Sequence, residues 1–265
     1  MRYGIILAAG LQTRFNDEKP KCLWPYDNKQ TILEKNVEEL NQYVDVVFVV
    51  VNKNINNKEI YDVLPTNMFP RPNVKVIEVE SGMGTGHAIY ETLKIIYHQV
   101  PSTDYNMAHD DILLIWGDSI QDEPSIIKQT IYNFNGKCTV PLKFEEDCYM
   151  NFMVRNNYII KAWQPHTKSG LHDFSLFMFD LNYMYVLLDL YHHKHHFENS
   201  LHEAFLVNGK RYNTKSGEMN FIDIFNEFGE SQFANTVIID DKNISSINAF
   251  NTVEEYNEII NRRKQ

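Results

Sequence analysis

The sequence predicts an α/β fold of three αβα layers, in which helices cover both faces of a Rossmann-like, mainly parallel sheet. The first observation behind this prediction is a set of short apolar runs typical of buried strands, at residues 3–7, 45–51, 74–79 and 112–116. The second is a set of helical patterns that alternate with those runs, at residues 31–43, 87–98 and 124–134. Because parallel strands need long crossover connections, this alternation favours parallel strand pairing.

Capping signals support two of the predicted helix starts. Thr31 and Glu34 have the spacing of a capping box, in which each residue satisfies a backbone N–H of the other. Thr252 and Glu255 repeat this spacing ahead of a last helix at residues 253–263. We therefore expect well-defined helix starts at these two places.

From about residue 137 the pattern changes to closely spaced strands. Asn156 and Asn157 form a turn signal between two strand-like runs. The strands expected in this part lie at residues 151–155, 158–163 and 174–180. No linker-like tract precedes them, so we expect a single domain over residues 1–265, with a first half at 1–136 and a second half at 137–265.

Composition favours a cytoplasmic protein that binds neither nucleic acid nor membrane. The formal net charge is −10, whereas sequence-independent binding to nucleic acid needs an excess of Lys and Arg. The apolar runs are too short to cross a bilayer, and the first strand begins at once, without a signal peptide. Cys22, Cys138 and Cys148 are widely spaced and form no CxxC pair, which predicts neither disulfides nor a zinc site.

The most informative motif follows the first predicted strand. Leu7-Ala8-Ala9-Gly10 places small residues where backbone N–H groups can approach a ligand closely. Arg14 and Lys21 then add two cations to the same short excursion. Bare amides and paired cations at the carboxyl end of a strand are typical of a polyphosphate site.

This segment resembles the signature of nucleotidyltransferases that activate phosphorylated metabolites, which join L-A-A-G, three residues, R, and then P-K with an apolar patch. Pro20-Lys21 and Leu23-Trp24-Pro25 match the later part of that pattern. The resemblance implies the nucleotide-diphospho-sugar transferase (glycosyltransferase-A-like) fold. It also implies that the first half binds the nucleotide, that the second half binds the acceptor, and that Arg14 and Lys21 are the catalytic cations.

A glycine-rich stretch at residues 80–88 is the second motif. Gly84-Thr85-Gly86 with the following His and Ala is similar to the G-T-G-H-A segment of N-acetylglucosamine-1-phosphate uridylyltransferases. The resemblance implies contacts to the base and the acceptor from this loop. Gly82 stands where those enzymes carry a Gln that recognises uracil, so CTP is favoured here and UTP remains the alternative.

Two oxygen-bearing residues form the predicted metal site. Asp118 follows the strand at 112–116, and a carboxylate at a strand end can approach a metal bound to phosphates. Asn251 matches the family's N-T-x-E segment, which supplies the second protein ligand. The resemblance therefore implies Mg²⁺ bound by Asp118 and Asn251.

The expected reaction joins a nucleoside triphosphate to a phosphorylated small molecule, with release of pyrophosphate. Gln164 and Asp173 fall near sugar-contacting positions of the relatives, but the residue types differ there. Glu218 belongs to a stretch that resembles their G-E-[YF]-x-x-T-D-I segment, with Ile222 instead of Thr. Sugar phosphates, amino alcohol phosphates and amino acid amide phosphates stay open as acceptors. Resemblance to CTP:phosphoglutamine cytidylyltransferases makes phosphoglutamine one candidate, with a role in capsule or surface glycan synthesis.

Three alternatives are weighed against this interpretation. A metal-dependent glycosyltransferase would usually carry a D-x-D triplet, which Gly117-Asp118-Ser119 lacks. A non-catalytic nucleotide-binding regulator would be expected to have lost Lys21 or Asp118. The histidines at residues 192–196 are at chelating spacing, but no Cys or carboxylate framework accompanies them, so a solvated helix is favoured over a metal site.

Overall fold

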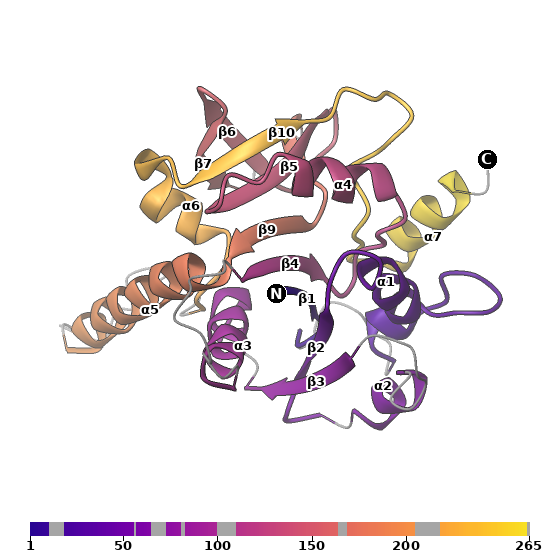
Figure 1. Ribbon diagram of the computed structural model, residues 1–265, viewed down its shortest axis with the longest axis horizontal. Coiled ribbons are helices and arrows are strands. Elements are labelled where there is room, and N and C mark those ends of the chain that lie inside the picture. The colour runs from indigo at the N-terminus through magenta and orange to yellow at the C-terminus, as the bar shows by residue number, and fades with distance from the viewer. Residues whose placement is uncertain are drawn as a thin grey trace.

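The computed structural model describes residues 1–10, 19–55, 57–64, 73–80, 83–99, 110–163, 169–204 and 218–263, with the backbone alone at 73, 99 and 195–204. Within this part of the chain, one mixed sheet of ten strands carries the whole fold (Figure 1). Its strands lie in the order β3-β2-β1-β4-β9-β5-β10-β7-β6, and β8 pairs with β5.

The first half of the sheet is parallel, as predicted. Its strands are β1 (Arg2–Leu7), β2 (Val46–Asn52), β3 (Asn73–Val79) and β4 (Asp111–Trp116). The central residues of β1, β2 and β4 are apolar and buried because both faces of the sheet are covered. Ile5 belongs to the core on one face and Ile6 to the core on the other, since successive side chains point to opposite sides.

The second half joins through β9, which runs antiparallel to both β4 and β5. Its strands are β5 (Cys138–Glu145), β6 (Asn151–Arg155), β7 (Tyr158–Trp163), β8 (Gly170–Asp173), β9 (Leu176–Asp180) and β10 (Ala234–Ile238). The predicted bounds of β6 and β7 are confirmed. The single strand expected at 174–180 is wrong at its start, because Ser175 has a left-handed φ of +56° that separates β8 from β9.

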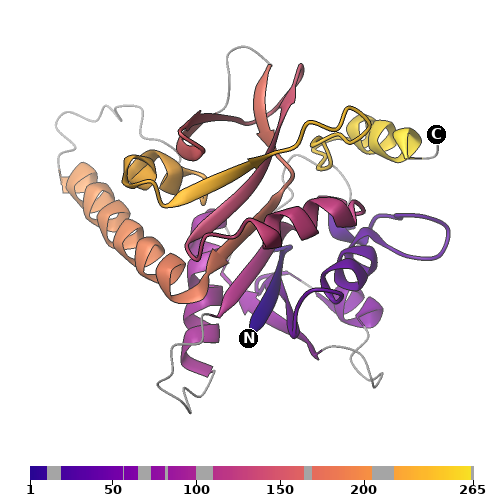
Figure 2. The same cartoon turned by 45° about the horizontal axis from the view of Figure 1, so that its top comes forward.

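Helices cover both faces of the sheet, which confirms the three-layer αβα class (Figure 2). On one face lie α3 (Thr85–Gln99), α5 (Leu181–Ala204) and α6 (Asp223–Phe228). On the other face lie α1 (Ile32–Leu40), α2 (Lys58–Val63) and α4 (Pro124–Tyr132). Two 3₁₀ turns, η1 (Lys21–Leu23) and η2 (Gly229–Ser231), and the last helix, α7 (Val253–Arg262), complete the described elements.

Both predicted capping boxes are present, at the starts of α1 and α7. Three predicted helices end earlier than expected: α1 ends at Leu40, α4 at Tyr132 and α7 at Arg262. Of the described helices, none combines the length and the apolar character that a bilayer-spanning segment needs.

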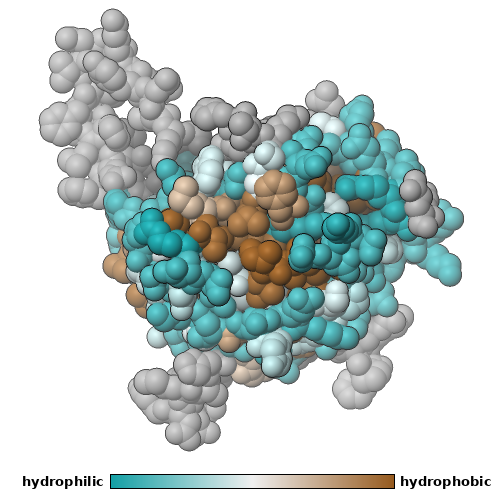
Figure 3. Space-filling view, turned by 90° about the horizontal axis from the view of Figure 1, so that it is seen from above, coloured by the Kyte–Doolittle hydropathy of each residue, from teal (hydrophilic) through white to brown (hydrophobic). Residues whose placement is uncertain are grey.

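The face seen in Figure 3 carries an apolar area bordered by hydrophilic residues. The second half of the sheet exposes several large apolar side chains, among them Phe144, Met153 and Ile238. Exposed apolar side chains are common on folded proteins.

A cluster of aromatic rings fills the core where the two halves of the sheet meet. Phe221 is 0% exposed, and its ring centroid lies 5.2 Å from that of Phe177 and 5.9 Å from that of Trp116. The rings of Phe179 and Phe225 pack on it from two further sides. Phe221 therefore joins strands β4 and β9 to the start of α6.

Replacing Phe221 by Ala should lower the free energy of unfolding by about 3–5 kcal/mol, because the substitution empties the centre of this cluster. Urea denaturation followed by circular dichroism measures the change. Tyr132→Ala is the control, since Tyr132 is 89% exposed and the expected change there is below about 0.5 kcal/mol. A loss below about 1 kcal/mol for Phe221→Ala would contradict this description of the core.

Candidate active site

The site begins where β1 and β4 end at the same edge of the sheet. The Gly117 N–H donates to the Leu7 carbonyl at 2.9 Å, and a Cβ on Gly117 would lie only 3.0 Å from the Ala8 Cα. A glycine is therefore needed for the two strand ends to meet. The Ala8 N–H is already used by the sheet, since it donates to the Val50 carbonyl, whereas Gly10 is exposed with open space around it.

Lys21 is the centre of the site. Although it carries a charge, the residue is only 8% exposed, because η1 turns it inward. Its Nζ donates to Asp118 Oδ2 at 3.2 Å and to the Phe250 carbonyl at 2.8 Å, and it lies 5.6 Å from the Phe250 ring centroid. A buried ammonium is stable only with such partners. Three segments far apart in sequence thus meet at one cation.

The thiol of Cys22 lies in the same electrostatic environment. Burial raises the pKa of Cys22 to about 12, and the negative charge of Asp118 adds to the effect. Cys22 itself is fully enclosed in the core beside Lys21. Its thiol therefore stays protonated and takes no part in nucleophilic chemistry.

The C-terminal segment lies alongside the loop that carries Asp118. Ser119 and Ala249 form an isolated antiparallel bridge, and the Ile120 N–H donates to the Asn248 carbonyl at 2.9 Å. In an antiparallel register, the residue before Ser119 lies beside the residue after Ala249. Asp118 is therefore adjacent to Phe250, and Asn251 comes directly after it.

The two segments that carry the predicted metal ligands, Asp118 and Asn251, therefore lie side by side. A carboxylate and an amide oxygen are donor types that Mg²⁺ accepts. Among the described residues, no group of three or more His, Cys, Asp or Glu side chains could hold a metal by itself. This donor set fits a magnesium ion that completes its coordination with phosphate oxygens and water, as Mg²⁺ usually does.

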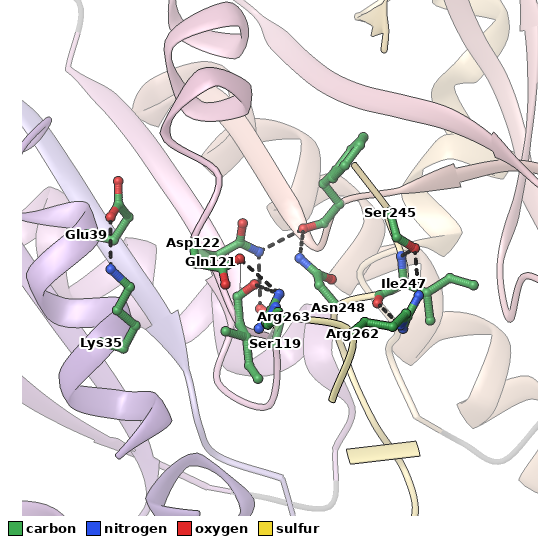
Figure 4. Close-up of polar contacts among 12 residues, drawn as sticks. Lys35, Glu39, Ser119, Gln121, Asp122, Ser245, Ile247, Asn248, Arg262 and Arg263 are labelled. Carbon is green, nitrogen blue, oxygen red and sulfur yellow. Dashed lines mark hydrogen bonds and ion pairs between the residues drawn. The ribbon is translucent and has the colours of Figure 1, made fainter. Parts of the chain in front are cut away.

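Contacts from α7 hold the C-terminal segment in place (Figure 4). Arg263 Nη2 lies 3.0 Å from Asp122 Oδ1, and Arg262 donates to the Ile247 carbonyl at 3.1 Å. Burial raises the pKa of Asp122, and the nearby guanidinium of Arg263 acts in the opposite direction. The ring of Tyr256 packs on Phe250. The Asp118 loop and the Asn251 segment thus share one support.

The glycine-rich loop makes close contacts, but with the protein's own backbone. Gly84 has a φ of +93°, and a Cβ there would lie 2.4 Å from the Met219 carbonyl oxygen. The Gly86 N–H donates to the same carbonyl at 2.8 Å, and Thr85 Oγ1 accepts from the Phe221 N–H. Our expectation that these glycines make room for a ligand is therefore corrected, because the close neighbour is the 219–221 segment.

The remaining predicted residues divide into three groups. Arg14, Gly82 and Gln164 lie outside the described residues. Glu218 is exposed and directly precedes the segment that packs on the glycine-rich loop. Asp173 is 5% exposed, its carboxylate accepts from the Ser175 N–H at 2.6 Å, and burial raises its pKa. This geometry supports the strand break at Ser175, so we leave Asp173 out of the acceptor site.

One histidine of the cluster, His192, packs against a neighbouring helix. His192 of α5 stacks on Tyr90 of α3, with 4.8 Å between the ring centroids. Tyr90 in turn donates a hydrogen bond to Asp189 at 2.6 Å. For His192 this packing agrees with the helical interpretation over the metal site.

Two buried asparagines lie near the site, and the sequence analysis did not identify them as site residues. Asn52 ends β2 at the same edge of the sheet, is fully buried and pairs in register with Val79, just before the glycine-rich stretch. Within the described residues its Nδ2 has no hydrogen-bond partner. Asn36, on α1, bonds to the loop that follows Asp118. A polar residue directly after an apolar strand run was the available signal for Asn52.

The comparisons with known proteins agree with this geometry. The sequence pattern of the family described as MobA-like NTP transferase domain matches residues 4–158. One similar solved structure, from Bacillus anthracis, is of a protein assigned as a glucose-1-phosphate thymidylyltransferase in complex with a sucrose. The two chains superpose with a TM-score of 0.68 at 15% identity, over 98% of this chain and 94% of that one. No curated protein sequence matches.

The family pattern covers more than half of the chain, and the likeness in structure supports the same fold. The chain belongs to the MobA-like NTP transferase domain family. It is a nucleotidyltransferase, and its central sheet has the Rossmann-like arrangement found in that solved structure.

Replacing Gly84 by Ala should displace the glycine-rich loop, since the new methyl group meets the Met219 carbonyl and the positive φ disfavours any side chain. We expect a loss of about 2–4 kcal/mol in the free energy of unfolding, measured by urea denaturation. Gly136→Ala is the matched control, because Gly136 also has a positive φ, of 80°, but open space around it. Equal losses in the two variants would contradict the steric explanation.

Proposed function

We propose that the protein transfers a nucleotidyl group in a Mg²⁺-dependent reaction. A nucleoside triphosphate and a phosphorylated small molecule would give a nucleoside diphosphate derivative of the acceptor and pyrophosphate. The observation that carries the proposal is Lys21, buried between Asp118 and the carbonyl of Phe250, the residue before Asn251. The proposal is supported because this cation, Asp118 and the segment that carries Asn251 lie together at the carboxyl edge of the parallel strands, where ligands bind in such sheets.

The main barrier to this reaction is repulsion between anions. An oxygen of the acceptor phosphate attacks the α-phosphorus, and the bond from the α-phosphorus to the bridging oxygen breaks, so that the electron pair leaves with pyrophosphate. Each like-charge pair at ~4 Å costs about 4 kcal/mol at an effective dielectric of about 20. Lys21, with Arg14 as a second proposed cation, would offset this repulsion. No general base is needed, because a phosphate monoester is already ionised near neutral pH.

The proposed metal ligands are Asp118 and Asn251. Bound there, Mg²⁺ would supply charge neutralisation for the triphosphate and the departing pyrophosphate. Lys21 has a separate part in this arrangement, because its ammonium holds the Asp118 carboxylate toward the site at 3.2 Å. Asp118 is itself partly open to solvent, with 36% of its side chain exposed, so a ligand can reach it.

For the base, we favour CTP over UTP. Gly82 has no side-chain amide with which to recognise uracil, and Asn52 offers a buried Nδ2 at the neighbouring strand end. An amide donor that has no partner in the described part of the protein can bond the N3 or O2 acceptor of cytosine. We propose Asn52 as a base-contacting residue, with the Ala9–Gly10 turn at the end of β1 placed beside the phosphates.

For the acceptor, we propose a phosphorylated small molecule that is a precursor of a capsule or surface glycan, with phosphoglutamine as one candidate. Glu218, exposed beside the glycine-rich loop, is the acceptor-facing residue among those described, and Gln164 is proposed with it. Sugar-1-phosphate uridylyl transfer is the second candidate, favoured by the likeness to the structure assigned as a glucose-1-phosphate thymidylyltransferase.

Lys21→Ala and Asp118→Ala should each lower the rate of pyrophosphate formation at least about 100-fold, because each removes charge from the reacting centre. The fold should persist, as judged by circular dichroism, since Asp118 is partly exposed and no strand depends on either side chain. Lys128→Ala removes the same charge from the exposed face of α4 and should keep the wild-type rate. Near-normal turnover in either site variant would refute the assignment.

A panel of the four ribonucleoside triphosphates against sugar-1-phosphates, phosphocholine and phosphoglutamine, scored by pyrophosphate release, tests the substrates. We expect the highest kcat/KM with CTP. Asn52→Leu should reduce the preference for CTP at least about tenfold, because it removes a specific hydrogen bond. Preference for UTP would correct the base and keep the reaction. No pyrophosphate from any pair would overturn the proposed function.

A further inference from the structure

A buried side-chain amide connects the two segments of the proposed metal site to helix α1. Asn36 is 0% exposed and lies on the face of α1 that carries Leu33, Val37 and Leu40 into the core. A polar side chain in such a place is costly unless its hydrogen bonds are satisfied. Asn36 satisfies both ends of its amide with the loop that follows Asp118.

The two bonds of Asn36 imitate those of a neighbouring strand. Its Nδ2 donates to the Ser119 carbonyl at 2.7 Å, and its Oδ1 accepts from the Gln121 N–H at 3.1 Å. On the opposite edge, Ile120 donates to the Asn248 carbonyl of the C-terminal segment. Residues 119–121 are thus held like a central strand, with a single side chain as the partner on one side.

A shared carbonyl completes the connection (Figure 4). Gln121 Nε2 and Asn248 Nδ2 both donate to the Phe174 carbonyl, at 2.7 and 2.8 Å. One donor comes from the loop after Asp118 and the other from the segment before Asn251. Both segments are therefore fixed to the same point at the start of β9.

We propose that Asn36 is a positioning residue that sets Asp118 relative to Asn251. It touches no substrate. Its effect arises because it fixes the backbone one residue beyond Asp118, while the bridge between Ser119 and Ala249 carries that position to the C-terminal segment. Mg²⁺ demands near-ideal octahedral geometry, so a displacement of about 0.5 Å in one ligand weakens binding. The inference rests on the proposed function for the identity of the metal site.

The test uses Asn36→Asp, which keeps the size of the side chain but replaces the donor to Ser119 by an acceptor. Two affinities are measured. Binding of the Mn²⁺–CTP complex is followed by water proton relaxation, and binding of CTP without metal is measured in EDTA. We expect the variant to bind the Mn²⁺–CTP complex at least tenfold more weakly, with CTP binding in EDTA unchanged within twofold. A merely structural role would not separate these two measurements.

The matched control is Thr130→Val, which removes a buried polar group on α4 from the same face of the sheet. It should lower the melting temperature without changing Mn²⁺–CTP binding. If Asn36→Asp does not fold, Gln121→Met is used, since it removes the hydrogen bond from Gln121 to the Phe174 carbonyl. It is expected to weaken Mn²⁺–CTP binding and to leave CTP binding in EDTA unchanged. Wild-type affinity for Mn²⁺–CTP in the folded variant overturns the positioning role. A wild-type protein that binds no Mn²⁺ complex of any of the four ribonucleoside triphosphates overturns the proposed function as well.

Discussion

The geometry of the site depends on the burial of one ammonium group. The Lys21 Nζ can stay in a site that is largely closed to water only because Asp118 and the Phe250 carbonyl accept its hydrogen bonds. This requirement joins the turn after the first strand, the loop after β4 and the segment before α7. Each of the three would be an ordinary surface connection alone. Together they form a site in which charges face the end of a parallel sheet.

The supporting contacts explain why distant segments can meet so closely. Gly117 lets the ends of β1 and β4 touch, the capping box of Thr252 starts α7 directly after Asn251, and Arg263 ties the end of α7 to Asp122. The polar atoms are satisfied by backbone groups and by amide side chains as well as by ion pairs. Such contacts are directional, which suits a site that must hold oxygen ligands in fixed places.

Much of the fold was predictable because its signals are local. Apolar runs and capping boxes identify the parallel strands and the starts of α1 and α7, and the Asn156-Asn157 turn gives the hairpin of β6 and β7. The break between β8 and β9 was not predictable, since a serine such as Ser175 does not indicate a left-handed φ. Within the site, Lys21 and Asp118 could be expected together from the motifs. The packing role of Gly84 and Gly86 could not be predicted, because the 219–221 segment that they contact is more than 130 residues away in sequence.

The central claim is that Lys21, Asp118 and Asn251 surround the phosphates of one bound nucleotide. A crystal structure of the protein with CTP and Mg²⁺ measures this directly. The account predicts a metal bound to oxygens of Asp118, Asn251 and the triphosphate, with the Lys21 ammonium in contact with a phosphate or with Asp118. A triphosphate bound at another part of the surface, with Lys21 and Asp118 still enclosed away from it, would contradict the account.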